Sequence, residues 1–332
     1  MEQQDLTTLQ NIRRHASELK WNCMHSPCVE KSINSHLLQK NGIIDNIIEA
    51  GHVIQIKLNE YHKMITEGPV AFNRIGINKA ISLPLFCNYH DTNVFKPIES
   101  SFKIDDYRSQ LLYSYRAVCA EVRKKEINIE ADNRILKAKT LDKRENKDFL
   151  EMTKLSLSGE KIGFNDIMKL KLDIESELFT ESKDLFGFKI FNYAFIGICM
   201  SATFTPETSD PNVDSNPILL DAILKKERLN PIIIHLIPQK QNLFILLGYH
   251  KNLVDSEILK YIDSWDALDK TQLQKKITDL ITNKVETWCI SESLYKRIPQ
   301  SVKQRYIDYW RSSLSIPPTY APIDFNLFEG EK

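Results

Sequence analysis

The amino-acid sequence predicts an α+β protein in three parts: an N-terminal module organised by a metal ion, a central pair of long helices, and a C-terminal region of helices and antiparallel strands. Three observations carry this prediction. Cysteine and histidine residues form two close pairs in the N-terminal third, one long segment has helical apolar spacing, and β-branched and aromatic residues concentrate after residue 185. The corresponding domains are predicted at residues 1–100, 101–160 and 161–332.

The N-terminal part alternates short helices with strands. Residues 5–20 have helical apolar spacing, and residues 35–50 predict one or two short helices interrupted near Gly42. Residues 52–58, HVIQIKL, alternate apolar and polar side chains, as a half-buried strand does. A second strand is expected near residues 71–77, before the pair Cys87 and His90.

The central part contains the clearest helix of the sequence, residues 104–126. Its apolar side chains recur at spacings of three and four and predict one buried stripe: Leu111, Leu112, Tyr115, Val118, Cys119 and Val122. Residues 127–160 carry many charges of both signs and are expected to form the second helix of a hairpin, with the charges on a solvated face. The boundary with the C-terminal part is expected within residues 140–180.

The C-terminal part is predicted to contain an antiparallel sheet. Residues 186–203 are rich in β-branched and aromatic side chains, and residues 231–238 and 242–250 predict a hairpin that turns at Gln239–Gln241. Residues 206–217 are polar and contain proline, which indicates a loop. Two helices and an extended tail are expected to complete the chain: residues 256–283, residues 301–313 and the segment after Ile316.

Bulk composition narrows the classes of function. The chain has 332 residues, of which 42% are hydrophobic and 27% charged, as in ordinary globular proteins. Lys plus Arg equals Asp plus Glu at 44 each, so any nucleic-acid surface must be local. No signal-peptide pattern and no apolar run long enough to span a bilayer is evident, which predicts a cytoplasmic protein without a membrane segment. In that compartment close cysteine pairs favour metal binding over disulfides.

The two pairs are Cys23 with Cys28 and Cys87 with His90. Each pair is close enough in sequence to place two donor atoms on one side of an ion, and three thiolates with one imidazole are a regular ligand set of structural Zn²⁺. The ion would join segments about sixty residues apart in the chain and constrain everything between them. The alternative is that these are unrelated buried cysteines.

Three sequence blocks surround these ligands: SHLLQ at residues 35–39, FCNYHD at 86–91 and FKPIE at 95–99. Over residues 23–99 the chain resembles treble-clef, HNH-type endonucleases, and also a group of bacterial proteins with SHxLQ, FCxxHD and FxPIE blocks that are suspected of roles in defence against phage. The resemblance implies a structural zinc and a histidine base. The spacing of four within the first pair and the histidine in the last pair depart from the HNH pattern.

The resemblance implies a catalytic role for three residues. His36 would take a proton from water, while Asp91 and Glu99 would hold a catalytic Mg²⁺ or Mn²⁺. Each has a structural alternative: His36 as a residue that hydrogen-bonds a backbone carbonyl, Asp91 as an acid favoured in the first turn of a helix, and Glu99 as an ordinary exposed side chain. His235 and His250, on either side of the predicted hairpin, are expected to be structural.

Two functions follow as hypotheses. The first is a metal-dependent endonuclease acting on DNA or RNA, whose C-terminal domain recognises the substrate or a protein partner. The second is a non-enzymatic module, structured by zinc, that binds protein or nucleic acid. The sequence shows no glycine-rich phosphate loop and no nucleophile–base set in the C-terminal part that would indicate a third function.

Overall fold

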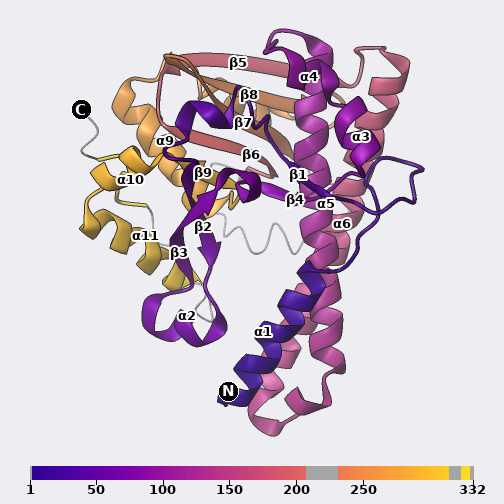
Figure 1. The fold of residues 1–332 in the computed structure, drawn as a ribbon, viewed down its shortest axis with the longest axis vertical. Helices are drawn as coiled ribbons and strands as arrows, with labels where there is room; N and C mark the ends of the chain where they lie inside the picture. The colour runs from indigo at the N-terminus through magenta and orange to yellow at the C-terminus, as the bar shows by residue number, and fades with distance from the viewer. Residues whose placement is uncertain (1, 207–230, 314–322, 330–332) are drawn as a thin grey trace.

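A computed structural model of the chain describes residues 2–206, 231–313 and 323–329. It is an α+β structure in which helices cover both faces of an antiparallel sheet, and two long antiparallel helices extend well beyond that sheet (Figure 1). The α+β class predicted from the sequence is therefore confirmed. No helix in the described part of the chain is both long and apolar enough to cross a membrane.

The main sheet has seven strands in the order β3-β2-β9-β6-β7-β8-β5, and every neighbouring pair is antiparallel. Its strands come from distant parts of the sequence: β2 (His52–Leu58), β3 (Val70–Gly76), β5 (Phe186–Ala194), β6 (Ile198–Phe204), β7 (Ile232–Gln239), β8 (Asn242–His250) and β9 (Trp288–Ile290). Strand β9 lies between β2 and β6 and pairs with both. The N-terminal strands thus belong to the same sheet as the C-terminal ones.

The two faces of the sheet bury separate hydrophobic clusters. One cluster lies beneath the C-terminal helices and contains alternate residues of β6 such as Met200 and Phe204. The opposite cluster contains Cys199 and Ile233 and packs against the central helices and the N-terminal module. The C-terminal helices are α8 (Ser256–Asp263), α9 (Lys270–Asn283), α10 (Glu292–Arg297) and α11 (Gln300–Ser313). The alternation follows from the opposite direction of successive side chains in a strand.

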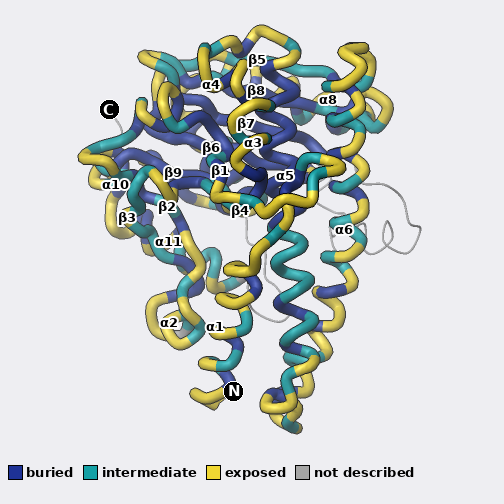
Figure 2. Tube along the Cα trace, turned by 45° about the vertical axis from the view of Figure 1, so that its right-hand side comes forward, coloured by how far each residue is buried: buried dark blue, intermediate teal, exposed yellow. Residues whose placement is uncertain are grey.

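The long helices are α5 (Tyr107–Lys137) and α6 (Lys147–Thr180), joined by short 3₁₀ turns η3 (Lys139–Leu141) and η4 (Arg144–Asn146). The predicted helical hairpin exists, but α5 continues to residue 137 and α6 runs well past residue 160. One end of the hairpin packs on the sheet, and helix α1 (Gln3–Ser17) packs along α5 toward the other end. The free end of the hairpin, with the turn, is largely exposed (Figure 2).

The rest of the N-terminal part forms a small module against α5. It contains a two-stranded sheet, β1 (Asn34–His36) with β4 (Ser82–Pro84), and the short helices α3 (Asn88–Asn93) and α4 (Lys96–Ser100). The remaining short elements are η1 (Ile44–Ile47), α2 (Tyr61–Glu67) and η2 (Ile77–Lys79). The helix expected at the start of residues 35–50 is wrong: Leu37 and Leu38 form a bend after β1, and both side chains are fully buried beneath the module.

The predicted strands at residues 52–58, 71–77, 231–238 and 242–250 are confirmed within a residue or two. The segment 186–203 forms two strands, β5 and β6, and the segment 256–283 forms two helices, α8 and α9. Most of the loop predicted at residues 206–217 and the first part of the predicted tail lie outside the described residues. The predicted boundary at residue 160 falls inside α6, and the main sheet combines strands from the first and last predicted domains.

Candidate metal centre

Cys23 and Cys28 lie on a tight loop that leads from α1 to β1. The loop is closed by two backbone hydrogen bonds, in which Cys23 N–H donates to the carbonyl of Glu30 and Cys28 N–H donates to the carbonyl of His25, both at 2.8 Å. These bonds reverse the chain between the two thiols. The loop therefore directs both sulfur atoms toward the same point.

Cys87 and His90 lie at the beginning of α3. Cys87 is the residue that caps this helix, and His90 lies in its first turn. Residues three apart on a helix are neighbours on its surface, so the Cys87 Sγ and His90 Nδ1 atoms are only 3.2 Å apart. The second predicted pair thus owes its geometry to the start of a helix.

The two pairs meet. The Cys23 Sγ atom lies 3.5 Å from His90 Nδ1, and the Cys28 Sγ atom lies 4.0 Å from Cys87 Sγ. All four donor atoms lie within 4.8 Å of one another. In the described ranges this is the one group of three or more His, Cys, Asp or Glu side chains gathered closely enough to bind a metal ion.

The environment of the cluster affects its thiols unequally. Cys23 and Cys87 are buried, whereas Cys28 and His90 are partly accessible. Burial raises the pKa of the Cys23 thiol to about 11. Burial also acts on Cys87, but hydrogen bonds from its own helix and from the neighbouring thiols outweigh it and lower the pKa of that group. Because metal ions bind thiolates, ion binding here would release protons.

A polar network fastens the ligand loop to the long helices. The His25 ring lies 4.2 Å from the His90 ring, and His25 Nδ1 is 3.3 Å from the Tyr115 hydroxyl of α5. That hydroxyl donates to Glu175 of α6, which also pairs with the Lys171 ammonium at 2.8 Å. Lys171 and Tyr115 are both almost fully buried. The loop is thus held against α5 and α6 through charged hydrogen bonds as well as apolar packing.

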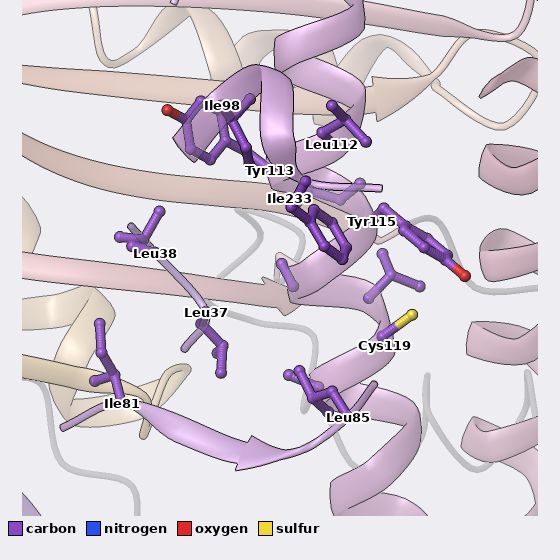
Figure 3. Close-up of a cluster of buried hydrophobic side chains, with 14 of the residues drawn as sticks. Leu37, Leu38, Ile81, Leu85, Ile98, Leu112, Tyr113, Tyr115, Cys119 and Ile233 are labelled. Carbon is purple, nitrogen blue, oxygen red and sulfur yellow. The ribbon is translucent and has the colours of Figure 1, made fainter. Parts of the chain in front are cut away.

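Apolar packing beneath the cluster comes from three directions. Figure 3 shows Leu85 of the N-terminal module close to Cys119 of α5, and Leu37, Tyr115 and Ile233 belong to the same buried cluster. All five side chains are at most 2% exposed. The part of the N-terminal module that carries the four donor residues, which we call the metal-ligand module, therefore packs on a continuous core that reaches the main sheet.

His36 lies on β1, apart from the four donor atoms. Its Nε2 atom lies 2.9 Å from the carbonyl oxygen of Ile77. A carbonyl oxygen can only accept, so Nε2 carries the hydrogen, and Nδ1 is the nitrogen of the neutral ring with a free electron pair. The hydrogen bond to a backbone carbonyl matches the structural alternative weighed for His36.

Asp91 and Glu99 both face the guanidinium of Arg116 on α5. Glu99 Oε1 lies 2.6 Å from Arg116 Nη1, and Asp91 Oδ1 lies 3.8 Å from Arg116 Nη2. The same guanidinium lies 4.1 Å from the centre of the Phe95 ring. Burial raises the pKa of Asp91, and Arg116 together with the Ser35 hydroxyl opposes that change. The two carboxylates expected to share a cation thus share a buried arginine.

Comparison of the chain with protein-family models, with curated proteins and with solved structures found no match. The site is therefore interpreted from its own atoms.

Arg116 is the residue of this region that the sequence analysis did not single out. It is 2% exposed and lies within a run of α5, from Ser109 to Ala120, in which every residue is buried. One signal could have revealed it. An arginine between Tyr115 and Ala117, inside an otherwise apolar stripe, requires a carboxylate partner because an unpaired buried charge is very costly.

Proposed function

We propose that Cys23, Cys28, Cys87 and His90 bind a structural Zn²⁺ ion. Zn–S distances of about 2.3 Å and Zn–N distances of about 2.0 Å in a tetrahedron place neighbouring donor atoms roughly 3.5 to 3.8 Å apart. The sulfur–nitrogen distances of 3.2 and 3.5 Å and the sulfur–sulfur distance of 4.0 Å lie close to these values. Three thiols also favour a soft or borderline ion over Mg²⁺ or Ca²⁺.

The proposed ion joins a loop to the start of a helix. Two ligands come from the loop before β1 and two from the first turn of α3, which is compatible with the treble-clef-like arrangement expected for the N-terminal module. With all four positions supplied by protein, the ion would have no open position for substrate. Its role would be to fix β1, α3 and the surface between them against α5.

The function best supported is that of a non-enzymatic, zinc-structured module that binds another macromolecule. The observation that carries this conclusion is the arginine. Arg116 forms a close ion pair with Glu99 at 2.6 Å, lies 3.8 Å from Asp91, and is itself packed against the Phe95 ring. A cation at these carboxylates would have to compete with the buried Arg116 guanidinium, whose charge would be left without its partner if Glu99 turned away.

The zinc proposal is tested by elemental analysis of two matched cysteine variants. Purified wild-type protein and Cys119→Ala are expected to contain close to one zinc per chain, whereas Cys87→Ala should contain almost none. Cys119 is a suitable control because it is buried and reduced but lies outside the ligand group. If Cys87→Ala is insoluble, the test is made on wild-type protein: a chelator should remove the ion and the near-ultraviolet circular dichroism together, and added Zn²⁺ should restore both.

Zinc retained at full stoichiometry in Cys87→Ala, or a wild-type protein that holds no zinc when refolded with it, would refute the ligand set.

A second candidate is the metal-dependent HNH-like endonuclease. One observation favours it: the bond from Nε2 to Ile77 fixes the His36 ring with Nδ1 available to accept a proton. In that mechanism water would give a proton to Nδ1 while its oxygen attacks phosphorus, and the leaving oxygen would depart with a proton from solvent. Asp91 and Glu99 would hold Mg²⁺ or Mn²⁺ only after release from Arg116.

Plasmid DNA and a structured RNA, each incubated with Mg²⁺, Mn²⁺ or EDTA, distinguish the two candidates. The non-enzymatic function predicts no cleavage by wild-type protein under any condition. The endonuclease predicts metal-dependent cleavage that His36→Ala abolishes and His62→Ala preserves, since His62 is an exposed histidine of α2. Cleavage by His36→Ala at the wild-type rate would indicate a contaminating nuclease and exclude the catalytic role of His36.

A further inference from the structure

The free end of the α5–α6 hairpin is hollowed. A cavity of about 530 Å³ lies between the last turn of α5, the connecting turns and the first turns of α6. Its floor is apolar and contains Ile135, Leu136 and Leu150. This hollow is remote from the metal centre: from Tyr115 to Lys137 along α5 the rise of 1.5 Å per residue amounts to roughly 33 Å.

Basic side chains outnumber acidic ones around the hollow, in a chain with no net charge. Its walls carry six basic side chains: Lys137, Lys139, Lys143, Arg144, Lys147 and Lys154. Only two acidic residues, Asp142 and Glu151, line it. Among the lining residues positive charges exceed negative ones by four, and Glu2 and Asp5, which contact Lys143, reduce this excess to two, against a formal net charge of zero for the whole sequence.

Two of the six cations are neutralised by neighbours. Lys143 lies 2.8 Å from Glu2 and 3.0 Å from Asp5 of α1, and Lys154 lies 2.7 Å from Glu151. The other four, which we call the tip cations, are Lys137, Lys139, Arg144 and Lys147. They are all exposed, and none forms an ion pair with any residue that the structure describes.

Four exposed cations around one hollow, on a part of the molecule that projects into solvent (Figure 2), fit a partner with regularly spaced negative charges. Among the residues that the structure describes, no aromatic side chain lines the hollow, so these residues offer no platform for stacking bases. An acidic protein would need matched apolar anchors, and the apolar floor here is small and recessed. Phosphates need only cations within reach.

We propose that the hairpin tip binds the phosphate backbone of a nucleic-acid duplex through Lys137, Lys139, Arg144 and Lys147, independently of sequence. The proposal rests on the function suggested above and names the partner class of the zinc-structured module. The hairpin carries this contact away from the sheet, so a long duplex can bind without meeting the body of the molecule.

The test measures binding of the full-length, zinc-loaded protein to fluorescein-labelled 20-base-pair DNA and RNA duplexes by fluorescence anisotropy. In the tip variant all four tip cations are replaced by alanine. It is compared with a control variant that also carries four alanine substitutions. The control replaces four exposed lysines that also form no ion pair among the described residues and that lie elsewhere: Lys20, Lys79, Lys103 and Lys161.

Four phosphate contacts predict a slope of about −3.6 in log affinity against log salt concentration. Wild-type protein and the control should therefore bind about 100-fold more weakly at 200 mM than at 50 mM salt. The tip variant should lose most of its affinity at 50 mM salt and most of the salt dependence. DNA binding without RNA binding, or the reverse, would identify which backbone is the partner and would support the surface.

Three outcomes would overturn the proposal: no binding of either duplex by wild-type protein at 50 mM salt, equal losses in the tip variant and the control, or binding of poly-glutamate as tight as that of the duplexes. Zinc content and circular dichroism of each variant are measured in parallel. If the tip surface fails with zinc intact, the zinc-structured module still stands. If wild-type protein holds no zinc but only the tip variant loses duplex binding, the ligand set is refuted and the tip surface stands.

Discussion

His235 is a buried histidine whose hydrogen-bond partner, the Ser201 hydroxyl, carries no negative charge that would stabilise a protonated imidazole. It is fully buried on β7, and its Nδ1 atom lies 3.1 Å from the Ser201 hydroxyl. The Tyr113 ring lies 6.0 Å away, and no carboxylate contacts the imidazole among the described residues. Burial lowers the pKa of His235 to about 3. The ring is therefore neutral in the folded protein, as expected for a structural histidine.

This shift makes stability depend on pH. Because the folded pKa of His235 lies below the unfolded value of 6.5, the unfolded chain binds more protons between these two values, and stability falls as pH decreases through that range. From pH 7.5 to 5.0 His235 alone should reduce the free energy of unfolding by about 2 kcal/mol. Urea titrations of wild type and His235→Gln at both pH values measure this difference.

Glutamine can keep a hydrogen bond to Ser201 but does not titrate, so His235→Gln should lose about 2 kcal/mol less than wild type on acidification. If the proposed metal ion is bound, its loss on acidification would affect both proteins equally and cancel in the comparison. Parallel losses in the two proteins would show that His235 is accessible to protons in the folded state.

Residue-level prediction succeeded where chemistry is local and failed where it depends on distant partners. The spacing within Cys23–Cys28 and Cys87–His90 is visible in the sequence, and the structure brings these donors together. The contacts of Asp91 and Glu99 could not be foreseen, because Arg116 reaches them from another helix. The catalytic assignment of His36, Asp91 and Glu99 remains a prediction.

At the scale of elements, helix α5 is buried over more of its surface than its apolar stripe predicts, because other elements surround it. The sequence predicts one apolar stripe, but α5 is buried on all sides from Ser109 to Ala120, because the sheet, α6 and the metal-ligand module surround it. Polar residues such as Ser114 and Arg116 therefore lie in the core. Their burial is explained by the positions of the other elements around α5. The local sequence pattern carries no information about those positions.

The start of α5 is fixed by a cap. The Asp106 carboxylate accepts hydrogen bonds from the Ser109 N–H at 2.9 Å and from the Ser109 hydroxyl at 2.8 Å. Asp106→Ala should lower the free energy of unfolding by about 1 kcal/mol, because a helix N–H is left without a partner. Denaturant titration measures the change, with Asp105→Ala as the control. Asp105 is exposed and precedes the cap, so an equal loss in both variants would contradict this role.

At residues 37–39 the prediction from the sequence differs from the structure, which has a bend in place of a helix. Residues 35–50 are predicted to form one or two short helices, yet Leu37 and Leu38 lie in a fully buried bend after β1 and only η1 is helical. A short apolar run that is buried on every side carries no periodicity that separates helix from turn. The strands are predicted better because their alternation reflects a sheet with two different faces.

At the scale of the whole molecule, the main sheet unites the two ends of the chain. Strand β2 pairs with β9 through Ile54 and Gln55, and its buried residues Ile54 and Ile56 pack with the C-terminal helices rather than with the metal-ligand module. Arg74 of β3 also pairs with Glu292 of α10 at 2.6 Å. Such long-range pairing has no local signature, so the sequence could indicate the strands but not their partners.

A fragment of residues 1–100 should therefore not fold by itself. Without β9 and the C-terminal helices, strand β2 loses one neighbour and its apolar face becomes exposed. With Zn²⁺ present, the fragment should give a poorly dispersed amide NMR spectrum and no cooperative urea transition, in contrast to the full-length chain. A well-dispersed spectrum and a cooperative transition would instead establish an autonomous N-terminal domain.

The position of β9 between β2 and β6 also orders events during synthesis. Ser293 and Glu49, which hydrogen-bond across this junction, are 244 positions apart in the chain. At translation rates of 5–20 residues per second, β2 and β3 must wait roughly 10 to 50 seconds for their partner strand to leave the ribosome. During that interval their apolar face is available to chaperones. A bound metal ion would order the neighbouring loop and α3 before the sheet can close.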